Sequence, residues 1–349
     1  MREFRSSFVV TGVAIVAAGF WGYSRGGIGG AASAVLLASI LALMEISLSF
    51  DNAVVNAAVL QTWNAFWQKL FMTVGMLVAV FGMRLLFPLL IVSVVTGLGL
   101  LETFQLALQQ PDTYSKHLSA HHAEVSAFGA AFLLLVTLQF LFDEEKEMHW
   151  FPWLETPLAQ YGSVLLSWVV TLGAVWLASQ LMPEAERGAV QLAGFFGVLS
   201  HVAVHGLSVL LEKNEAKAAG DAVKGGSIGG FMYLELLDAS FSFDGVIGAF
   251  AITNDIIIIM LGLAVGAMFV RSMTIFLVHR GTLQQFVFLE HGAHYAIGVL
   301  ALLMFVSVRY HVPEWITGLS GVAFIGLSLY SSVLYRRRHP QAEQEQLKH

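Results

Sequence analysis

Residues 44–54 read MEISLSFDNAV, and residues 237–247 read LDASFSFDGVI. Aligned without a gap, the two stretches place Glu45 on Asp238, and in both the second acid follows six residues later. Two serines and the phenylalanine before the second acid are also identical. Apolar composition alone does not reproduce acids at a fixed spacing. The chain therefore contains two copies of one unit.

A second pattern follows each copy of this motif. Gly75 lies nine residues before Arg84 in the first half, and Gly262 lies nine residues before Arg271 in the second. Charged side chains inside apolar segments are rare and functional, so we interpret the two arginines as charge-balancing or gating groups. We expect the glycines to be points of close packing between helices.

The overall composition is that of a membrane protein. Of the 349 residues, 57% are hydrophobic and 12% are charged, whereas soluble domains carry roughly 25% charged residues. The mean hydropathy is +0.72. Runs such as AFLLLVTLQFLF at 131–142 are apolar on every side, which favours helices over the alternating strands of a β-barrel. We predict an all-α polytopic membrane protein.

Charge-poor runs of about 20 residues, the length needed to cross the hydrocarbon core, occupy nearly the whole chain. We predict ten spans near residues 7–24, 30–58, 68–94, 122–142, 157–181, 187–211, 227–251, 255–279, 292–310 and 314–335. Five spans per copy is an odd number, so the second copy would cross the membrane in the opposite orientation, as in many transporters. The predicted repeats are residues 1–181 and 187–336, followed by a polar tail at 337–349.

The distribution of lysine and arginine predicts the orientation. One orientation places twelve of the 18 in inner segments, four in outer segments and two within spans. Because cytoplasmic loops are enriched in these residues, both termini are expected in the cytoplasm. The segment 143–150, DEEKEMHW, is acidic, but acidic residues contribute little to this rule. We interpret the segment as either a solvated loop or an entrance that attracts cations. A net charge of −6 gives no basic stripe for nucleic acid.

The repeated acids form the candidate site. A carboxylate near the bilayer centre costs roughly 2.5–3.5 kcal/mol, so such acids mark function. Six residues of continuous helix turn the chain by about 600°, so Glu45 and Asp51 could face one site only if the helix unwinds between them. Oxygen ligands suit divalent cations such as Mn²⁺, Ca²⁺ and Mg²⁺, and the absence of cysteine argues against a thiolate site. The candidate metal ligands are Glu45, Ser47, Asp51, Asn52, Asp238, Ser240 and Asp244.

Four carboxylates would overcharge a site that holds one dication. We therefore expect either proton exchange or compensation by Arg84 and Arg271. In an alternative interpretation, each acid is only the structural partner of an arginine. Glu235, one turn before Asp238, has no acidic counterpart in the first copy and is a candidate for proton handling, as a residue at the mouth of the site or at the membrane interface.

Histidines offer an alternative enzyme interpretation. His201 and His205 lie one turn apart, and HLSAHH at 117–122 adds three more, spacings that resemble the histidine boxes of membrane di-iron enzymes. A third box is missing, because HGAH at 291–294 is incomplete and is expected at the interface. We interpret His201 and His205 as buried polar groups or as proton-handling neighbours of the site. No hydrolase or phosphate-loop motif is present, so no enzyme and no organic cofactor are expected.

The stretches EISLSFDNAVV at 45–55 and DASFSFDGVIG at 238–248, each followed by an arginine-bearing helix, resemble the TerC family of bacterial membrane proteins. The resemblance covers roughly residues 30–310 and is closest to the family's long ten-span branch. It implies a bacterial inner-membrane location and a link to tellurium resistance or to export of manganese or calcium. It also implies an ion-site role for Glu45, Asp51, Asn52, Asp238 and Asp244. The second copy departs from the pattern at Asp238, in place of Glu, and at Gly245, in place of Asn.

These observations predict a transporter that exports a divalent metal cation as its substrate, driven by an ion or proton gradient. Two other functions stay open. One is a non-transporting membrane scaffold in a metal or tellurium stress-response complex, and the other is export of small organic ions, which would need a larger apolar cavity. The expected partners are the lipid bilayer and the metal cation, with a homo-oligomer as an open alternative.

Overall fold

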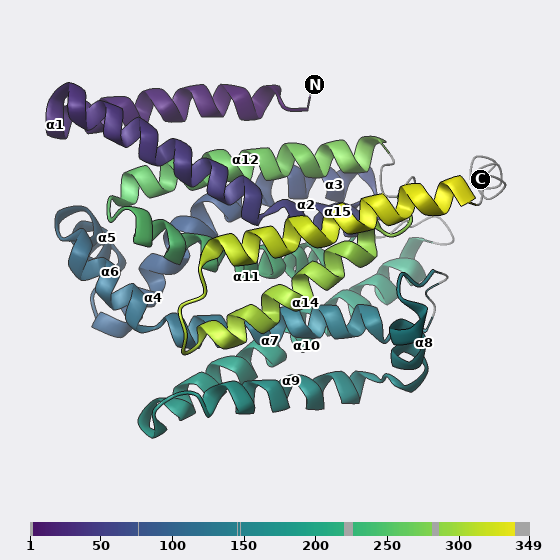
Figure 1. The fold of residues 1–349 in the computed structure, drawn as a ribbon. Helices are drawn as coiled ribbons and strands as arrows, with labels where there is room; N and C mark the ends of the chain where they lie inside the picture. The colour runs from purple at the N-terminus through teal and green to yellow at the C-terminus, as the bar shows by residue number, and fades with distance from the viewer. Residues whose placement is uncertain are drawn as a thin grey trace.

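The computed structural model describes residues 3–75, 77–144, 146, 148–219, 226–280 and 286–338. Some helical residues in these ranges, among them Asp51, His205 and Asp244, are described by their backbone alone. Within this part of the chain every regular element is a helix (Figure 1). The prediction of an all-α protein is confirmed.

Helix α1, Arg5–Leu48, is folded back on itself into two arms. The fold lies at Gly26 and Gly27, and Gly27 adopts a φ of 61°, a region open to glycine at little steric cost. The two arms contact each other next to this fold, since a Cβ on Gly22 would clash with the Gly30 carbonyl oxygen. The two arms correspond to the first predicted span and to the start of the second.

The helix that carries the first motif is interrupted at Ser49, whose φ and ψ are −100° and 17°. α1 ends one residue earlier, and α2 runs over Phe50–Leu60. The interruption predicted between the two acids is therefore present in the first copy. It is absent from the second, where α11 is continuous over Ile228–Ile252.

The third predicted span contains wide helical turns. Its segments are α3 (Ala65–Leu70), η1 (Phe71–Gly75), η2 (Val78–Leu86) and α4 (Phe87–Thr96), with η1 and η2 in the π conformation. Hydrogen bonds in a π-helix join residues five apart, and such turns are frequent at functional sites. The equivalent helix of the second half, α12 (Ile256–Arg280), is α-helical throughout.

Residues 100–120, where no span is predicted, form two short helices, and most of the remaining helices follow the predicted spans. These helices are α5 (Leu100–Gln109), α6 (Pro111–Ala120), α7 (His122–Leu141), α8 (Pro152–Tyr161), α9 (Val164–Ser179), α10 (Glu184–Ala219), α14 (Leu289–Ser307) and α15 (Glu314–Arg338). The span predicted at 157–181 falls on a bent pair of helices, with α8 and α9 at 109° to each other. The Ser163 hydroxyl accepts a hydrogen bond from the Leu166 N–H (3.1 Å), which starts a new helix at this point.

Seven helices of the described residues are long and apolar enough to cross a membrane, or eight if the bent pair is one span. α1 is counted once among them although it is folded. The best 18-residue window of α7 is 67% buried, whereas those of α1 and α15 are 28% buried. Exposed apolar helix faces of this kind are stable in lipid and not in water. The chain is a multi-pass membrane protein embedded in the bilayer.

The helices of the two motif copies pack against elements of the opposite half. α1 and α2 contact α12, α11 contacts η2 and α7, and α14 contacts α7 and α2. Figure 1 shows both termini and α8 towards one side of the molecule, with the fold of α1 and helices α5 and α6 towards the other.

Candidate functional site

Glu45 of α1 and Asp238 of α11 meet at the guanidinium of Arg84, which lies on η2. Arg84 Nη2 donates a hydrogen bond to Glu45 Oε1, and Nη1 lies 3.8 Å from Asp238 Oδ2. The three side chains are 2%, 9% and 3% exposed for Glu45, Asp238 and Arg84. Removing one partner of such a buried pair would leave an uncompensated charge. The structure thus brings together one acid from each copy of the motif, as predicted.

Asn52 of α2 completes this group. Its amide Nδ2 donates to Asp238 Oδ1, so the motif residue of one copy binds the acid of the other. Arg84 is fixed from a further side, because Nη1 also donates to the Ala79 carbonyl (2.7 Å). We call Glu45, Asn52, Arg84 and Asp238 the central cluster.

In the first copy of the motif, Ser49 contacts the central cluster, and the predicted ligand Ser47 does not. Ser49 donates its hydroxyl to Glu45 Oε1 (3.1 Å), whereas Ser47 is exposed and donates to the Leu43 carbonyl (2.9 Å). The cause is helical periodicity: residues four apart share a face of a helix, and residues two apart do not. In the second copy, Ser240 likewise donates to its own helix, to the Leu236 carbonyl (3.0 Å).

The same periodicity identifies a residue that the motif did not reveal. Asn56 lies on the face of Glu45, Ser49 and Asn52, at spacings of four, seven and eleven residues from Glu45. It is 3% exposed, and its Oδ1 has no hydrogen-bond partner in the structure. Counting helical positions from Glu45, rather than matching the repeat, would have found it.

A small cavity of about 20 Å³ adjoins the central cluster. One water needs about 10–15 Å³, so the cavity has room for one particle of that size. Its polar lining comprises Asn56, Arg84, Glu235, Asp238, Arg271 and Thr274. Both carboxylate oxygens of Glu235 are buried without a hydrogen-bond partner. Glu235 also lies so close to Gly75 that a Cβ there would clash with its Oε1, and it lines the cavity together with Asp238 and Arg84.

Glycines of the second half make room for Glu45. A Cβ on Gly266 would clash with the Cβ and Cγ of Glu45, and a Cβ on Gly245 would come within 2.7 Å of its Oε2. Gly262 similarly packs against Leu41, since its Cβ would lie 2.5 Å from the Leu41 Cβ. The expectation that the glycines permit close helix packing is confirmed at these positions.

Arg271 does not occupy a position equivalent to that of Arg84. It lines the cavity, but its Nε donates to the Met72 carbonyl (2.6 Å) and its Nη1 to the Ser6 hydroxyl (3.4 Å). Neither partner is an acid, so within the described residues only one of the two predicted charge-balancing arginines reaches the motif acids.

Of the two histidines predicted as proton-handling neighbours, His201 has aromatic neighbours. His201 is fully buried and packs edge-on against Phe132 and Tyr233, with ring centroids 5.1 and 5.9 Å away. The side chains of His205, Asp51 and Asp244 lie outside the described residues. Among the side chains that are described, no group of three or more His, Asp and Glu is arranged to hold a metal ion.

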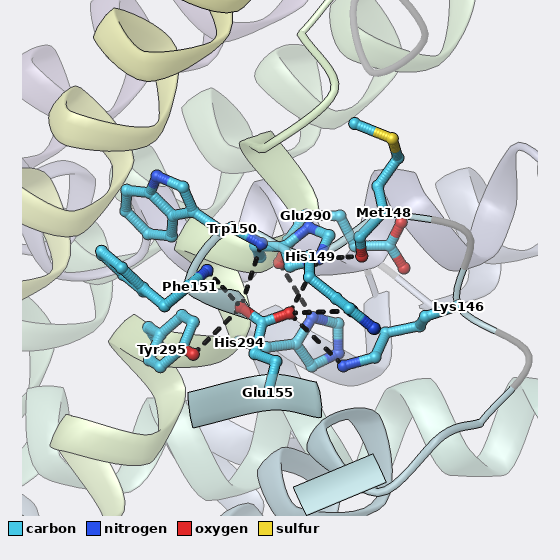
Figure 2. A network of polar contacts seen from close by, with 10 residues as sticks. Lys146, Met148, His149, Trp150, Phe151, Glu155, Glu290, His294 and Tyr295 are labelled. Carbon is cyan, nitrogen blue, oxygen red and sulfur yellow. Dashed lines mark hydrogen bonds and ion pairs between the residues drawn. The ribbon is translucent and has the colours of Figure 1, made fainter. Parts of the chain in front are cut away.

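Glu155 of α8 is the centre of a second buried network that the sequence analysis missed (Figure 2). It is 0% exposed. Its Oε1 accepts hydrogen bonds from the backbone N–H groups of Trp150 and Phe151 (3.2 Å each) and from the Tyr295 hydroxyl (3.0 Å). Glu155 is the one charged residue between positions 150 and 181, and this isolation was the available signal.

The other carboxylate oxygen of Glu155 faces three basic side chains. Oε2 lies 3.3 Å from His291 Nε2, 3.5 Å from His149 Nδ1 and 3.7 Å from Lys146 Nζ. Burial raises the pKa of Glu155, but hydrogen bonds from His291, Phe151 and Tyr295 outweigh it and leave a pKa of about 2. We call Glu155 and these partners the Glu155 network.

The histidines that open α14, which are predicted at the membrane interface, are buried within the protein. His291 and His294 are 5% and 9% exposed. His294 stacks on Phe140 with ring centroids 3.9 Å apart, and Lys146 Nζ lies 4.4 Å from the centre of the same ring. Phe140 of α7 thus contacts both α14 and the segment that follows α7. Polar contacts between that segment and α14 are drawn in Figure 2.

Comparison with known proteins gives one result. No curated protein and no solved structure matches the chain. A family model described as "Protein of unknown function (DUF475)" matches residues 50–339. This range includes Asn52, Arg84, Asp238 and Glu155, and it begins five residues after Glu45. Because the match covers well over half of the chain, the protein belongs to the DUF475 family.

Proposed function

We propose that the protein is a membrane transporter that exports a divalent metal cation of the Mn²⁺ or Ca²⁺ type through the central cluster. The observation that carries the proposal is the burial of Glu45 and Asp238, from separate halves of the chain, at one point among membrane helices. Carboxylates buried among membrane helices mark sites that bind or move ions or protons. The oxygen groups of Glu235 and Asn56 beside them are the ligands that such cations prefer.

The size and the charge of the site support a small cation over an organic one. The adjoining cavity holds about 20 Å³, far below the roughly 300–1,000 Å³ of pockets for organic ligands. Two oxygens of Glu235 and one of Asn56 lack a hydrogen-bond donor. A bound cation or protons would satisfy these atoms, whereas an apolar substrate would not.

We further propose ten spans in two inverted repeats. Counting the two arms of α1 separately and adding α9 and α11 to the seven would raise the count to ten. Contacts between the halves also support this arrangement: α2 packs against α12 and α14, and α11 packs against η2 and α7. When the two halves are exchanged, the contacts of α2 become the contacts of α11. A two-fold axis between the halves requires this correspondence.

The proposed setting is the bacterial inner membrane, with both termini in the cytoplasm and with a relationship to TerC proteins through the repeated motif. The lysine and arginine distribution supports the orientation. So does the location of both termini and α8 towards one side (Figure 1), because an even number of spans returns the chain to its starting side.

The test is Mn²⁺ flux into liposomes that contain the purified protein, with and without a pH gradient. Wild type should carry Mn²⁺, and Glu45→Gln combined with Asp238→Asn should abolish the flux. Glu184→Gln, which removes an exposed acid at the start of α10, should leave it unchanged. Absence of flux in the wild type would refute the transporter, and equal flux in both conditions would exclude proton coupling.

A cell-based comparison separates the transporter from the scaffold. In a deletion strain, the same double variant should fail to restore metal tolerance if the protein moves ions. A scaffold should keep its phenotype, because the two isosteric substitutions leave the surface of the molecule unchanged.

A further inference from the structure

Arg84 contacts both motif acids at once and so bridges the two halves of the molecule. Its two terminal nitrogens face Glu45 and Asp238, and its side chain is 3% exposed. A bound cation shared by the two acids would lie between the same carboxylates. The guanidinium therefore occupies the place that the proposed substrate requires, and both cannot be there together.

The charges around the cavity favour exchange over joint binding. Three carboxylates, from Glu45, Glu235 and Asp238, and two guanidinium groups, from Arg84 and Arg271, border the cavity or one another. With each of these described groups counted in its charged form, they sum to −1, and without Arg84 they sum to −2; the side chains of Asp51 and Asp244 lie outside the described residues and are not counted. A dication would leave +1 in the first case and would be neutralised in the second. In an interior of low polarity, the neutral arrangement is strongly preferred.

We propose that Arg84 is a tethered counter-ion, which occupies the cation site of the empty protein and must leave the motif acids before a divalent cation binds. This inference rests on the proposed function. It assigns Arg84 the role of an internal competitor rather than that of a permanent structural partner.

The local structure gives Arg84 a means of leaving. η2, which carries it, has π-helical turns, and such turns are frequent at functional sites. In the proposed exchange, a return of these turns to α-helical pairing would change the direction of the Arg84 side chain. The equivalent Arg271 shows the disengaged arrangement, with its guanidinium on the Met72 carbonyl and the Ser6 hydroxyl. Of the repeated pair, Arg84 thus contacts Glu45 and Asp238, whereas Arg271 contacts a carbonyl and a hydroxyl.

The experiment measures equilibrium binding of Mn²⁺ to the purified full-length protein in detergent, from the loss of the free-Mn²⁺ paramagnetic signal. Arg84→Gln removes the competitor and should bind Mn²⁺ at least tenfold more tightly than the wild type, because the site is no longer occupied from within. Arg84→Lys keeps the charge and should stay close to the wild type. Arg309→Gln, at an exposed position outside the site, is the matched control and should equal the wild type.

A second arm covers the case in which Arg84→Gln does not fold. In Arg84→Ala, guanidinium ion at low millimolar concentration should enter the vacated place, stabilise the protein and compete with Mn²⁺. The same concentration should not affect Mn²⁺ binding to the wild type, because the Arg84 side chain already occupies this place.

The outcomes distinguish this inference from the function on which it rests. If the wild type binds and transports Mn²⁺ while Arg84→Gln binds it equally or more weakly, Arg84 is structural and the inference fails alone. If neither binds Mn²⁺ and no flux is seen, the transporter itself is refuted. Guanidinium that neither stabilises Arg84→Ala nor competes there would also overturn the role of competitor.

Discussion

At the residue scale, the two departures of the second motif from the first compensate each other. Asp238 stands in the place of Glu45, and Gly245 stands in the place of Asn52. The shorter acid receives the amide of Asn52, and the longer acid lies against the glycine, where a Cβ would come within 2.7 Å of Glu45 Oε2. In each pair a long side chain meets a short one, so steric fit explains the altered sequence.

Restoring the first motif in the second copy should therefore disturb the site. Gly245→Asn would push the Glu45 carboxylate away from Arg84, and overpacking of this kind costs about 1–3 kcal/mol. Glu45→Asp in the same chain should recover part of the loss, because it shortens the opposing acid. Denaturant unfolding in detergent, followed by the fluorescence of the eight tryptophans, measures both changes.

The control for this pair is Gly326→Asn, since a Cβ at Gly326 meets no atom within 4 Å. It should lack any coupling to Glu45→Asp. Strictly additive effects of Gly245→Asn and Glu45→Asp would contradict the compensation, because residues in contact should show a coupling free energy of about 0.5–3 kcal/mol.

Sequence reasoning predicted the principal acids of the site and missed its finer composition. The repeat and the rarity of membrane carboxylates were enough to bring Glu45, Asp238 and Arg84 into one group. Ser47 was chosen because the motif contains it, although Ser49 lies on the face of Glu45. The difference between Arg84 and Arg271 could not be predicted, because a repeat implies equal roles and a single conformation of the protein need not realise them equally.

At the scale of elements, hydropathy located most helices and missed the bend between α8 and α9. Gly162 and Ser163 carry no charge, so a search for charge-free runs passes over them, whereas the hydroxyl of Ser163 starts a new helix. Glu155 lies between the acidic segment 143–150 and the span predicted at 157–181, so the same search gave it no role. Its burial depends on partners from α14, more than 130 residues away in the chain, which no local pattern reveals.

The Glu155 network should be the main attachment of α8 to α14. Glu155→Gln keeps the shape of the side chain but removes the charge that faces Lys146, His149 and His291. Breaking a buried ion pair from one side costs about 3–5 kcal/mol, so the thermal midpoint of unfolding should fall clearly. Glu144→Gln, at an exposed position close by, should leave the midpoint unchanged, and an unchanged midpoint for Glu155→Gln would show that the network is not stabilising.

The same network predicts a direction of pH dependence. The folded-state pKa of Glu155 is about 2, below the value of about 4.3 for an unfolded glutamate. A depressed pKa contributes stability that is fully present above the unfolded value and is lost as the pH falls through the folded value. Between about pH 4 and pH 2, wild type should therefore lose more stability than Glu155→Gln. Parallel losses would contradict this assignment.

At the scale of the whole molecule, the two halves share their central packing and differ at their edges. The first arm of α1 packs on α12, where the Ser7 hydroxyl donates to the Met268 carbonyl (2.6 Å). The corresponding first helix of the second half, α10, packs instead on α7, α9 and α11. The repeat could predict the centre, where its motif lies, but not the edges, where the two copies have no sequence pattern in common.

The proposed orientation can be measured directly, because the chain has no cysteine of its own. Single substitutions Lys116→Cys and Glu144→Cys introduce one thiol each at exposed positions of α6 and of the segment after α7. A membrane-impermeant maleimide added to intact cells should label the first. The second should react only after the membrane is permeabilised. The reverse pattern would invert the topology and place both termini outside.

The placement of Arg84 between two acids also bears on the direction of net movement. A carrier that has released its ion must reset across the bilayer with the site vacant, and a vacant site with unbalanced charge resists that step. In the proposed transporter, the protein's own guanidinium takes the ion's place during the reset. No second ion has to travel back with it, so the cycle would permit net transport as well as exchange of one ion for another, and the direction of net transport would follow the electrochemical gradients across the membrane.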